Sequence, residues 1–190
     1  MSIHLILGGA RSGKSSFAER QAAHFEASTK SKVTYLATAQ PLDAEMSARI
    51  ERHQQQRPDH WTTIGSPIAL ASTIEQLVIT HQREHKTAIT ILIDCLTLWL
   101  SNCLCSPEKS RWQEEKQHFL KVLSTHKKTT GVNLLLVSNE VGHGIVPLGE
   151  LSRNFVDQAG WLHQDIAAIA TQVDFIVAGI ALPLKPKNKQ

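Results

Sequence analysis

The sequence is poor in cysteine, in net charge and in long hydrophobic runs, and each shortage disfavours a class of protein. Its three cysteines, Cys95, Cys103 and Cys105, form no C-x-x-C pair, so reduced thiols are favoured over a zinc site or a disulfide framework. No run approaches the roughly 20 apolar residues of a membrane span, and residues 1–7 lack the pattern of a signal peptide. We therefore expect a soluble, cytoplasmic protein.

The formal charge is only +3, from 20 Lys and Arg against 17 Asp and Glu in 190 residues. Basic and acidic residues alternate along most of the chain, so no face is built to neutralise a polyanion, and a nucleic-acid partner is disfavoured. The sequence has no internal repeat and no linker rich in Gly or Ser. We expect one domain over residues 1–182, followed by a flexible tail over 183–190 in which two prolines interrupt regular structure.

Short β-rich runs alternate with helical patterns along the chain. Four of the five runs are almost continuously apolar, as strands covered on both faces must be. Strands that alternate with helices imply right-handed crossovers, so the sequence predicts an α/β fold with a mainly parallel sheet flanked by helices. The predicted strands are 3–7, 32–38, 88–93, 133–138 and 174–179, and the predicted helices are 15–27, 43–56, 110–127 and 151–169.

The first predicted strand is followed by GGARSGKSS, residues 8–16. Gly8, Gly13, Lys14 and Ser15 match G-x-x-x-x-G-K-[ST] between a strand and a helix, the context in which this pattern binds a nucleoside triphosphate. The glycines let backbone N–H groups converge on an anion, and the helix dipole adds positive charge. Lys14 is expected to contact the β and γ phosphates, and Ser15 to ligate magnesium. A glycine-rich turn with an exposed lysine is a weak alternative.

Asp94 closes the apolar run ITILID. An aspartate at the carboxyl end of a buried strand lies at the sheet edge where open α/β folds bind ligands. It is expected to hold the metal through water, as the equivalent carboxylate does in other P-loop proteins. A helix cap for the segment that follows is the alternative interpretation.

A histidine stands among arginines on the helix predicted over 43–56. Arg49, Arg52 and Arg57 flank His53 in the sequence. A neutral imidazole attacks phosphorus readily, and cationic neighbours both lower its pKa and neutralise an incoming phosphate. A solvated histidine on a charged helix explains the same pattern, so the residues alone leave both interpretations open.

Motifs spread over the whole chain carry more information than any one of them. In order they are GGARSGKS, YLATAQ, DAEMSARIERHQQQRP, DCLTLWLSN, SNEVGHGIVP and RNFVDQAG. From about residue 3 to residue 182 they resemble the bifunctional adenosylcobinamide kinase / adenosylcobinamide-phosphate guanylyltransferase family of cobalamin biosynthesis. The resemblance implies a RecA-like P-loop fold. It also implies that ATP or GTP phosphorylates adenosylcobinamide, and that GMP from GTP then passes through a covalent histidine intermediate to the new phosphate. The products are adenosylcobinamide-GDP and pyrophosphate.

The resemblance also assigns roles to individual residues. It implies that His53 takes up GMP, that Lys14 acts at the phosphate loop, and that the chain forms a homotrimer.

The sequence departs from the usual family pattern in two places. At Gly65 and Ser66 the family often has an acidic residue before a proline, and at His163 and Gln164 it usually has Asn-Gln. Ser15 and Asp94 are expected to hold magnesium. The expected nucleotide-binding residues are Gly8, Gly9, Ala10, Arg11, Ser12, Gly13, Lys14, Ser15, Thr38, Ala39, Gln40, Gln54, Gln55, Gln56, Arg57 and Asp94.

Two other functions remain open. One is a P-loop kinase of another small alcohol, with His53 a bystander. The other is a RecA-type nucleotide-dependent regulatory module, which the lack of a basic stripe disfavours.

Several further residues have two interpretations each. Glu140, in a glycine-rich loop after a predicted strand, is expected either to orient a substrate hydroxyl or a metal, or to bond N–H groups of its own turn. Arg153 and Asp157 have i, i+4 spacing, which predicts an ion pair on the last helix. The four tryptophans are expected to stack on a corrinoid or, more often for this residue type, to pack in the core or at a subunit interface.

Overall fold

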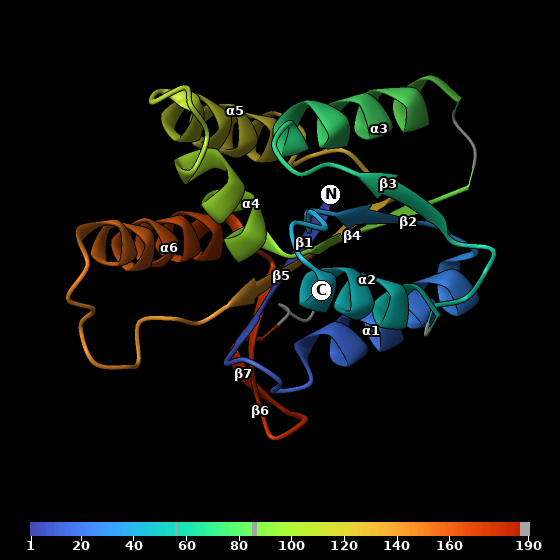
Figure 1. The fold of residues 1–190 in the computed structure, drawn as a ribbon. Helices are drawn as coiled ribbons and strands as arrows, with labels where there is room; N and C mark the ends of the chain where they lie inside the picture. Colours follow the sequence, from blue (N-terminus) through green and yellow to red (C-terminus); the bar gives the residue numbers. More distant parts are fainter. Residues whose placement is uncertain (56, 85–86, 187–190) are drawn as a thin grey trace.

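A computed structural model describes residues 1–55, 57–84 and 87–186; for residues 49 and 53 it describes the backbone alone. The strands form one seven-stranded sheet in the order β3-β2-β4-β5-β1-β6-β7 (Figure 1). The strands are β1 (Ser2–Gly8), β2 (Lys32–Ala37), β3 (Thr62–Gly65), β4 (Ile89–Asp94), β5 (Val132–Asn139), β6 (Gln172–Val177) and β7 (Ile180–Lys185). The helices are α1 (Lys14–Thr29), α2 (Ala44–Gln55), α3 (Leu70–Glu84), α4 (Leu96–Leu104), α5 (Arg111–Thr125) and α6 (Glu150–Ile169).

The sheet is parallel from β3 to β6, and only β7 runs antiparallel, beside β6. This confirms the predicted α/β fold with a mainly parallel sheet. β1 lies between β5 and β6, so the loop that follows it leaves the sheet near its middle. In this register Gly8 pairs with Asn139 on β5, and Asp94 on β4 pairs with Val137 on β5. The carboxyl ends of β1, β4 and β5 therefore meet at one edge, where open α/β sheets bind ligands.

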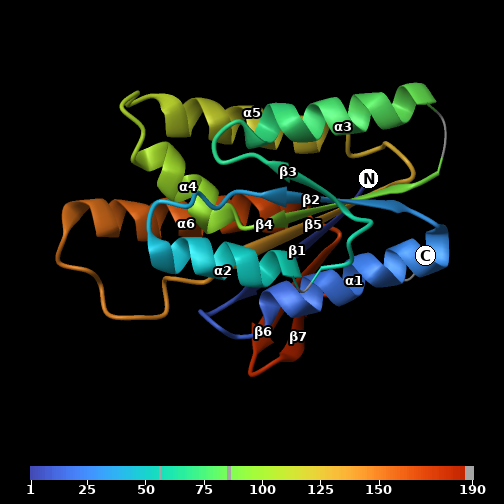
Figure 2. The same cartoon turned by 45° about the vertical axis from the view of Figure 1, so that its right-hand side comes forward.

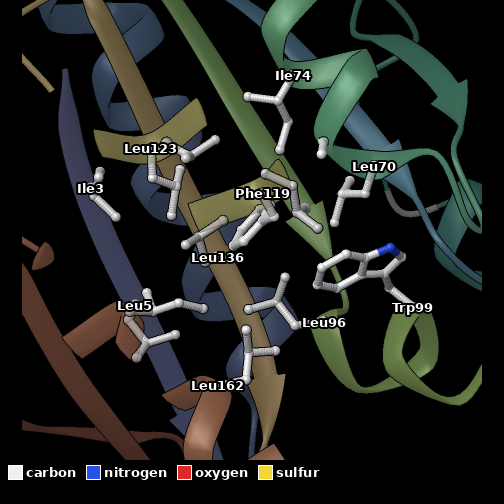
Figure 3. Packing of buried hydrophobic residues seen from close by; sticks show 14 of the residues in the cluster. Ile3, Leu5, Leu70, Ile74, Leu96, Trp99, Phe119, Leu123, Leu136 and Leu162 are labelled. Atoms are coloured by element: carbon white, nitrogen blue, oxygen red, sulfur yellow. The ribbon is translucent and has the colours of Figure 1, made fainter. Parts of the chain in front are cut away.

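Helices cover both faces of the sheet, as Figures 1 and 2 show. On one face, α3, α4, α5 and α6 bury the larger hydrophobic cluster, in which Trp99 packs against Phe119 with ring centroids 5.1 Å apart (Figure 3). On the other face, Ala18 and Ala22 of α1 are fully buried against the sheet. Because side chains alternate along a strand, Ile3 and Leu5 of β1 join the first cluster and Ile6 the second. Burial on both faces explains why these strands read as continuous apolar runs.

All five predicted strands and all four predicted helices are present, with ends that differ by one or two residues in most cases. Four elements were not predicted: β3, α3, α4 and β7. β3 has only four residues, most of them exposed, so it lacks an apolar run. α4 has apolar residues nearly all round because it is buried between other elements, which removes the helical period.

The expected irregular tail over 183–190 is wrong for its first three residues. Residues 180–185 form β7, which pairs with β6 through Val177 and Ile180 and onward to Val173 and Lys185. Pro183 is tolerated because β7 is an edge strand and the ladder is irregular between Val173 and Asp174, opposite this proline. Residues 187–190 lie outside the described part of the chain. Within that part, no helix is long and apolar enough to cross a membrane.

Candidate functional site

The loop after β1 has the backbone geometry that its glycines predict. Gly8 has φ 156°, and a Cβ there would lie 2.5 Å from the carbonyl oxygen of Ile176 on β6. Gly13, which precedes α1, has φ 95° and lies against Gly179, whose N–H donates to the carbonyl of Ser12 at 2.9 Å. A side chain at either glycine would push the loop away from the β6–β7 hairpin. The phosphate loop thus packs directly against the β6–β7 hairpin.

Lys14 is buried at the start of α1. Its Nζ donates to the carbonyl oxygen of Gly9 at 2.5 Å and lies 3.5 Å from Ser12 Oγ. Burial lowers the pKa of Lys14, and the nearby acidic groups Cys95 and Asp94 raise it by less. The ammonium is folded back onto its own loop, where a phosphate oxygen would replace the carbonyl as its partner.

A cavity of about 570 Å³ opens over this loop. It is bounded by the loop, the ends of β2, β4 and β5, and one face of α2. Of the predicted nucleotide-binding residues, those that line it are Ala10, Arg11, Ser12, Gly13, Lys14, Ser15, Ala39, Gln54, Arg57 and Asp94. The cavity therefore brings together residues from four separate parts of the chain.

Other predicted residues are placed differently. Gly8 and Gly9 shape the loop from outside the lining. Thr38 is fully buried behind the cavity, where its Oγ1 donates to the carbonyl of Cys95 and accepts from the N–H of Cys95, both at 2.8 Å. Gln40 and Gln55 are not among the described residues that line the cavity, and Gln56 lies outside the described residues.

Asp94 lines the same cavity as Ser15 and Lys14. The phenol of Tyr35 donates to Asp94 Oδ2 at 3.0 Å, and burial raises the pKa of Tyr35, so this phenol stays a donor. A hydroxyl and a carboxylate beside a phosphate-binding loop are the oxygen ligands that magnesium takes together with waters and phosphate oxygens. Ser15 and Asp94 therefore fit the predicted metal. Among the described residues, no cluster of three or more His, Cys, Asp or Glu side chains forms a separate metal site.

Arg57 lines the cavity, and two of its buried donors make no hydrogen bond. Its guanidinium carbon lies 3.3 Å from the centroid of the Tyr35 ring, and its Nε lies 3.9 Å from Glu19 Oε1 on α1. Its side chain is only 8 % exposed, yet Nε and Nη1 make no hydrogen bond, nor does Glu19 Oε1. The unsatisfied Nε and Oε1 therefore face each other, and the residue as a whole puts a positive charge at the wall of the cavity, where an anionic ligand would be favoured.

The face of α2 that borders the cavity carries Met46, Ile50 and Gln54. His53 lies on the same helix, seven positions after Met46 and three after Ile50. At 3.6 residues per turn, position 53 is within about 20° of Met46 around the helix axis. The side chain of His53 lies outside the described part of the structure, so its predicted role stays a prediction.

The whole chain resembles proteins of one kind. Residues 4–184 match the family described as cobinamide kinase / cobinamide phosphate guanyltransferase, CobU. The chain belongs to this family. It is 48 % identical over 181 residues to the bifunctional adenosylcobalamin biosynthesis protein CobP of Pseudomonas aeruginosa, covering 95 % of this chain and 96 % of that one. It is 36 % identical to the protein CobU of Escherichia coli, covering 95 % and 98 %. A solved ATPase domain covers 92 % of this chain and 68 % of its own, with TM-score 0.56 and 14 % identity, which confirms the RecA-like fold.

Sequence reasoning missed several residues that line the cavity of this CobU-family chain, among them Tyr35 and Asn139. Tyr35 lies two positions before Ala37 on β2, so the strand's alternation puts both on the cavity side. Asn139 ends β5, and its Nδ2 donates to Thr97 Oγ1 at 2.9 Å. The signal that could have found Asn139 is the one that identifies Asp94, a polar residue at the end of a buried strand.

The remaining candidates are resolved by their contacts. Glu140 Oε1 accepts from the N–H of Gly142 at 2.6 Å, which is the predicted bond within its own turn. Its Oε2 lies 3.6 Å from Nδ1 of the buried His163, whose Nε2 is 2.8 Å from Ser138 Oγ. Burial lowers the pKa of His163, and Glu140 raises it by less.

The predicted ion pair between Arg153 and Asp157 is replaced by backbone contacts. Arg153 Nη1 donates to the carbonyl oxygen of Pro147 at 3.2 Å and to that of Leu148.

Three of the four tryptophans are buried, as the packing interpretation predicts. The indole N–H groups of Trp61, Trp99 and Trp112 donate to Glu26, Ile68 and Gln158 respectively. Trp161 on α6 is 52 % exposed.

Proposed function

We propose that this chain phosphorylates adenosylcobinamide with ATP or GTP and then transfers GMP from GTP to the adenosylcobinamide phosphate. The observation that supports this most is the meeting of Lys14, Asp94 and Arg57 in one cavity bordered by the α2 face near position 53. We propose that the cavity holds the triphosphate between the loop and α2. We propose that residues 1–182 carry both reactions as a single domain.

In the kinase step, the hydroxyl oxygen of the aminopropanol arm bonds to the γ-phosphorus while the bond from that phosphorus to the β–γ bridging oxygen breaks. The nucleoside diphosphate leaves and the hydroxyl proton passes to solvent. Lys14 neutralises charge that builds on the β and γ phosphates, and the loop N–H groups hold them in place. Ser15 and Asp94 would hold magnesium, which would help to neutralise the negative charge of the phosphates.

In the guanylyl step, a ring nitrogen of His53 bonds to the α-phosphorus of GTP and pyrophosphate leaves. A phosphate oxygen of adenosylcobinamide phosphate then bonds to the same phosphorus, the P–N bond breaks, and its electron pair returns to the imidazole. Splitting the reaction in this way replaces one difficult attack by two easier ones. Arg57 at the cavity wall is suited to a phosphate of GTP, because guanidinium groups bind phosphate oxygens in pairs.

Turnover tests the proposal. Purified protein is incubated with adenosylcobinamide, GTP and magnesium, and the corrinoid products are separated by mass. We expect adenosylcobinamide phosphate and then adenosylcobinamide-GDP, with pyrophosphate released in equal amount to the second product. Phosphorylation of another alcohol without any corrinoid product would favour a different small-molecule kinase. Nucleotide binding without any transfer would favour a regulatory module.

We also propose, from the family resemblance, that the protein assembles as a homotrimer and acts in the cytoplasm. The buried, unpaired thiols of Cys95 and Cys103 support a reducing compartment. Light scattering after gel filtration tests the trimer.

A further inference from the structure

A second cavity, of about 150 Å³, lies between residues 141–147, in the loop after β5, and the first half of α6. Arg153, Val156 and Asp157 form its helical side. The cavity is separate from the nucleotide cavity and shares no lining residue with it. Nothing in the proposed nucleotide chemistry uses it.

The loop around this cavity is held at both ends. At its start, the N–H of Glu140 donates to the carbonyl of Gly8 at 2.9 Å, and the Glu140 carboxylate bonds Gly142 and lies beside His163. At its end, Arg153 bonds the carbonyls of Pro147 and Leu148. The cavity is therefore built by specific contacts.

The two cavities adjoin at the end of β5. Asn139 lines the nucleotide cavity and Val141, two residues later, lines the second. Asn139 also pairs with Gly8, the first residue of the phosphate loop. In Figures 1 and 2 the loops after β1 and β5 leave the sheet on the same side. An acceptor in the second cavity would thus lie beside the phosphate end of a bound nucleotide, which is where phosphoryl transfer requires it.

The surface around the cavity is unusually apolar. Ile145 and Leu148 are each 97 % exposed, and Val146 and Leu151 are also largely exposed. Trp161 lies one helical turn beyond Asp157, and Arg153, Asp157 and Trp161 share one stripe of α6 because they are four residues apart. Exposed apolar patches of this kind mark binding surfaces.

Two charged residues that line the cavity, Arg153 and Asp157, suit the polar groups of a corrinoid acceptor. The carboxylate of Asp157 has no ion-pair or hydrogen-bond partner within the described ranges, and only Nη1 of Arg153 is used by the loop. A carboxylate accepts from a hydroxyl or amide, and a guanidinium binds a phosphate. The acceptor of the first reaction carries a hydroxyl and that of the second a phosphate, on a large flat macrocycle with apolar and amide groups.

We propose that this cavity and the surface around it bind the corrinoid acceptor. The aminopropanol arm enters the cavity between Arg153 and Asp157, and the macrocycle lies over Ile145, Leu148 and Trp161. This inference rests on the proposed function, since it locates that function's acceptor. The arm alone suits the volume of the cavity, and the exposed apolar residues suit the ring.

Equilibrium dialysis with adenosylcobinamide, read by its visible absorbance, tests the site. We expect Trp161→Ala and Leu148→Ser to weaken binding about tenfold or more, and Arg153→Gln to raise KM for adenosylcobinamide phosphate more than for adenosylcobinamide. All three variants should still bind GTP and take up GMP like the wild type. Leu182→Ser, an exposed leucine on β7, is the matched control and should bind the corrinoid normally.

Normal corrinoid binding by Trp161→Ala and Leu148→Ser would overturn the proposal. So would a loss of binding that accompanies a change of oligomeric state in light scattering, because the apolar face would then be a contact between copies of the chain. If the wild type turns over the corrinoid while these variants bind it normally, this proposal alone fails. If the wild type neither binds nor modifies the corrinoid, the proposed function fails as well.

Discussion

The central carbon of the Arg57 guanidinium lies 3.3 Å from the centroid of the Tyr35 ring, while the phenol of Tyr35 donates to Asp94. One tyrosine thus joins the segment after α2 to the carboxylate at the end of β4. The arginine is held by packing on the ring and by its ion-pair contact with Glu19 at 3.9 Å. An arginine positioned in this way loses little conformational entropy when it binds a phosphate.

Arg57→Ala should weaken GTP binding by about tenfold to a hundredfold, because a hydrogen bond to a charged group contributes about 1.5–3 kcal/mol. Titration of a fluorescent GTP analogue measures the loss. Arg57→Lys should recover only part of the affinity, since an ammonium neither stacks nor binds in two places. Tyr35→Phe, which keeps the ring, is the control and should change GTP affinity much less than Arg57→Ala. Equal affinity in Arg57→Ala and wild type would remove the arginine from the site.

The affinity for GTP should fall at alkaline pH because of Lys14. Burial lowers the pKa of this lysine below 10.5, so the free protein loses the ammonium as pH rises through the lowered value. The triphosphate is expected to bind the charged form, and its affinity therefore decreases once the pH exceeds the lowered value. Binding measured from about pH 7 to pH 10 should show this decrease in the wild type and not in Lys14→Arg, which keeps its charge. Parallel pH profiles for the two proteins would contradict the prediction.

Gly8→Ala should destabilise the fold by about 1–3 kcal/mol, the usual cost of overpacking. The new Cβ would meet the Ile176 carbonyl at 2.5 Å, and neither strand backbone can yield easily. Gly160→Ala on α6 is a matched substitution into open space, where alanine should stabilise the helix by about 0.5–1 kcal/mol. Urea unfolding of both variants gives the comparison. A Gly8→Ala protein as stable as the wild type would mean that the loop does not pack on β6 in this way.

Ionisation of the Glu19 carboxyl should lower the free energy of unfolding as the pH rises from the acid range. Burial raises the pKa of its carboxyl above 4.5, and Arg57 lowers it by less. A raised folded-state pKa means that the unfolded chain ionises first, so stability falls as pH rises from about 4.5 through the higher folded-state value. Glu19→Gln removes this titration. Thermal unfolding at a series of pH values should show the melting temperature of the wild type falling relative to that of Glu19→Gln across this window, and a constant difference would refute the assignment.

The sequence predicted the sheet and the phosphate loop because both depend on local rules. Strands buried on two faces must be apolar, and the loop between β1 and α1 needs glycine at Gly8 and Gly13 for its backbone. Tyr35 and Asn139 could not be found in this way, because they reach the cavity only through the register of β2 and β5 beside β4 and β1. The contact of Arg57 with Glu19 joins residues 38 positions apart, and no local pattern records it. β7 was missed because Pro183 argues against a strand unless its edge position is known.

The central claim is that GMP is carried on His53, and intact-protein mass after incubation with GTP and magnesium tests it most directly. The account predicts one GMP per chain, stable to base and labile to acid, mapped to His53 and absent from His53→Ala and Lys14→Ala. His53→Ala should still bind GTP, because the phosphate loop is untouched. A wild-type protein that turns over adenosylcobinamide phosphate without ever carrying GMP, or a His53→Ala protein that is labelled normally, would contradict the account.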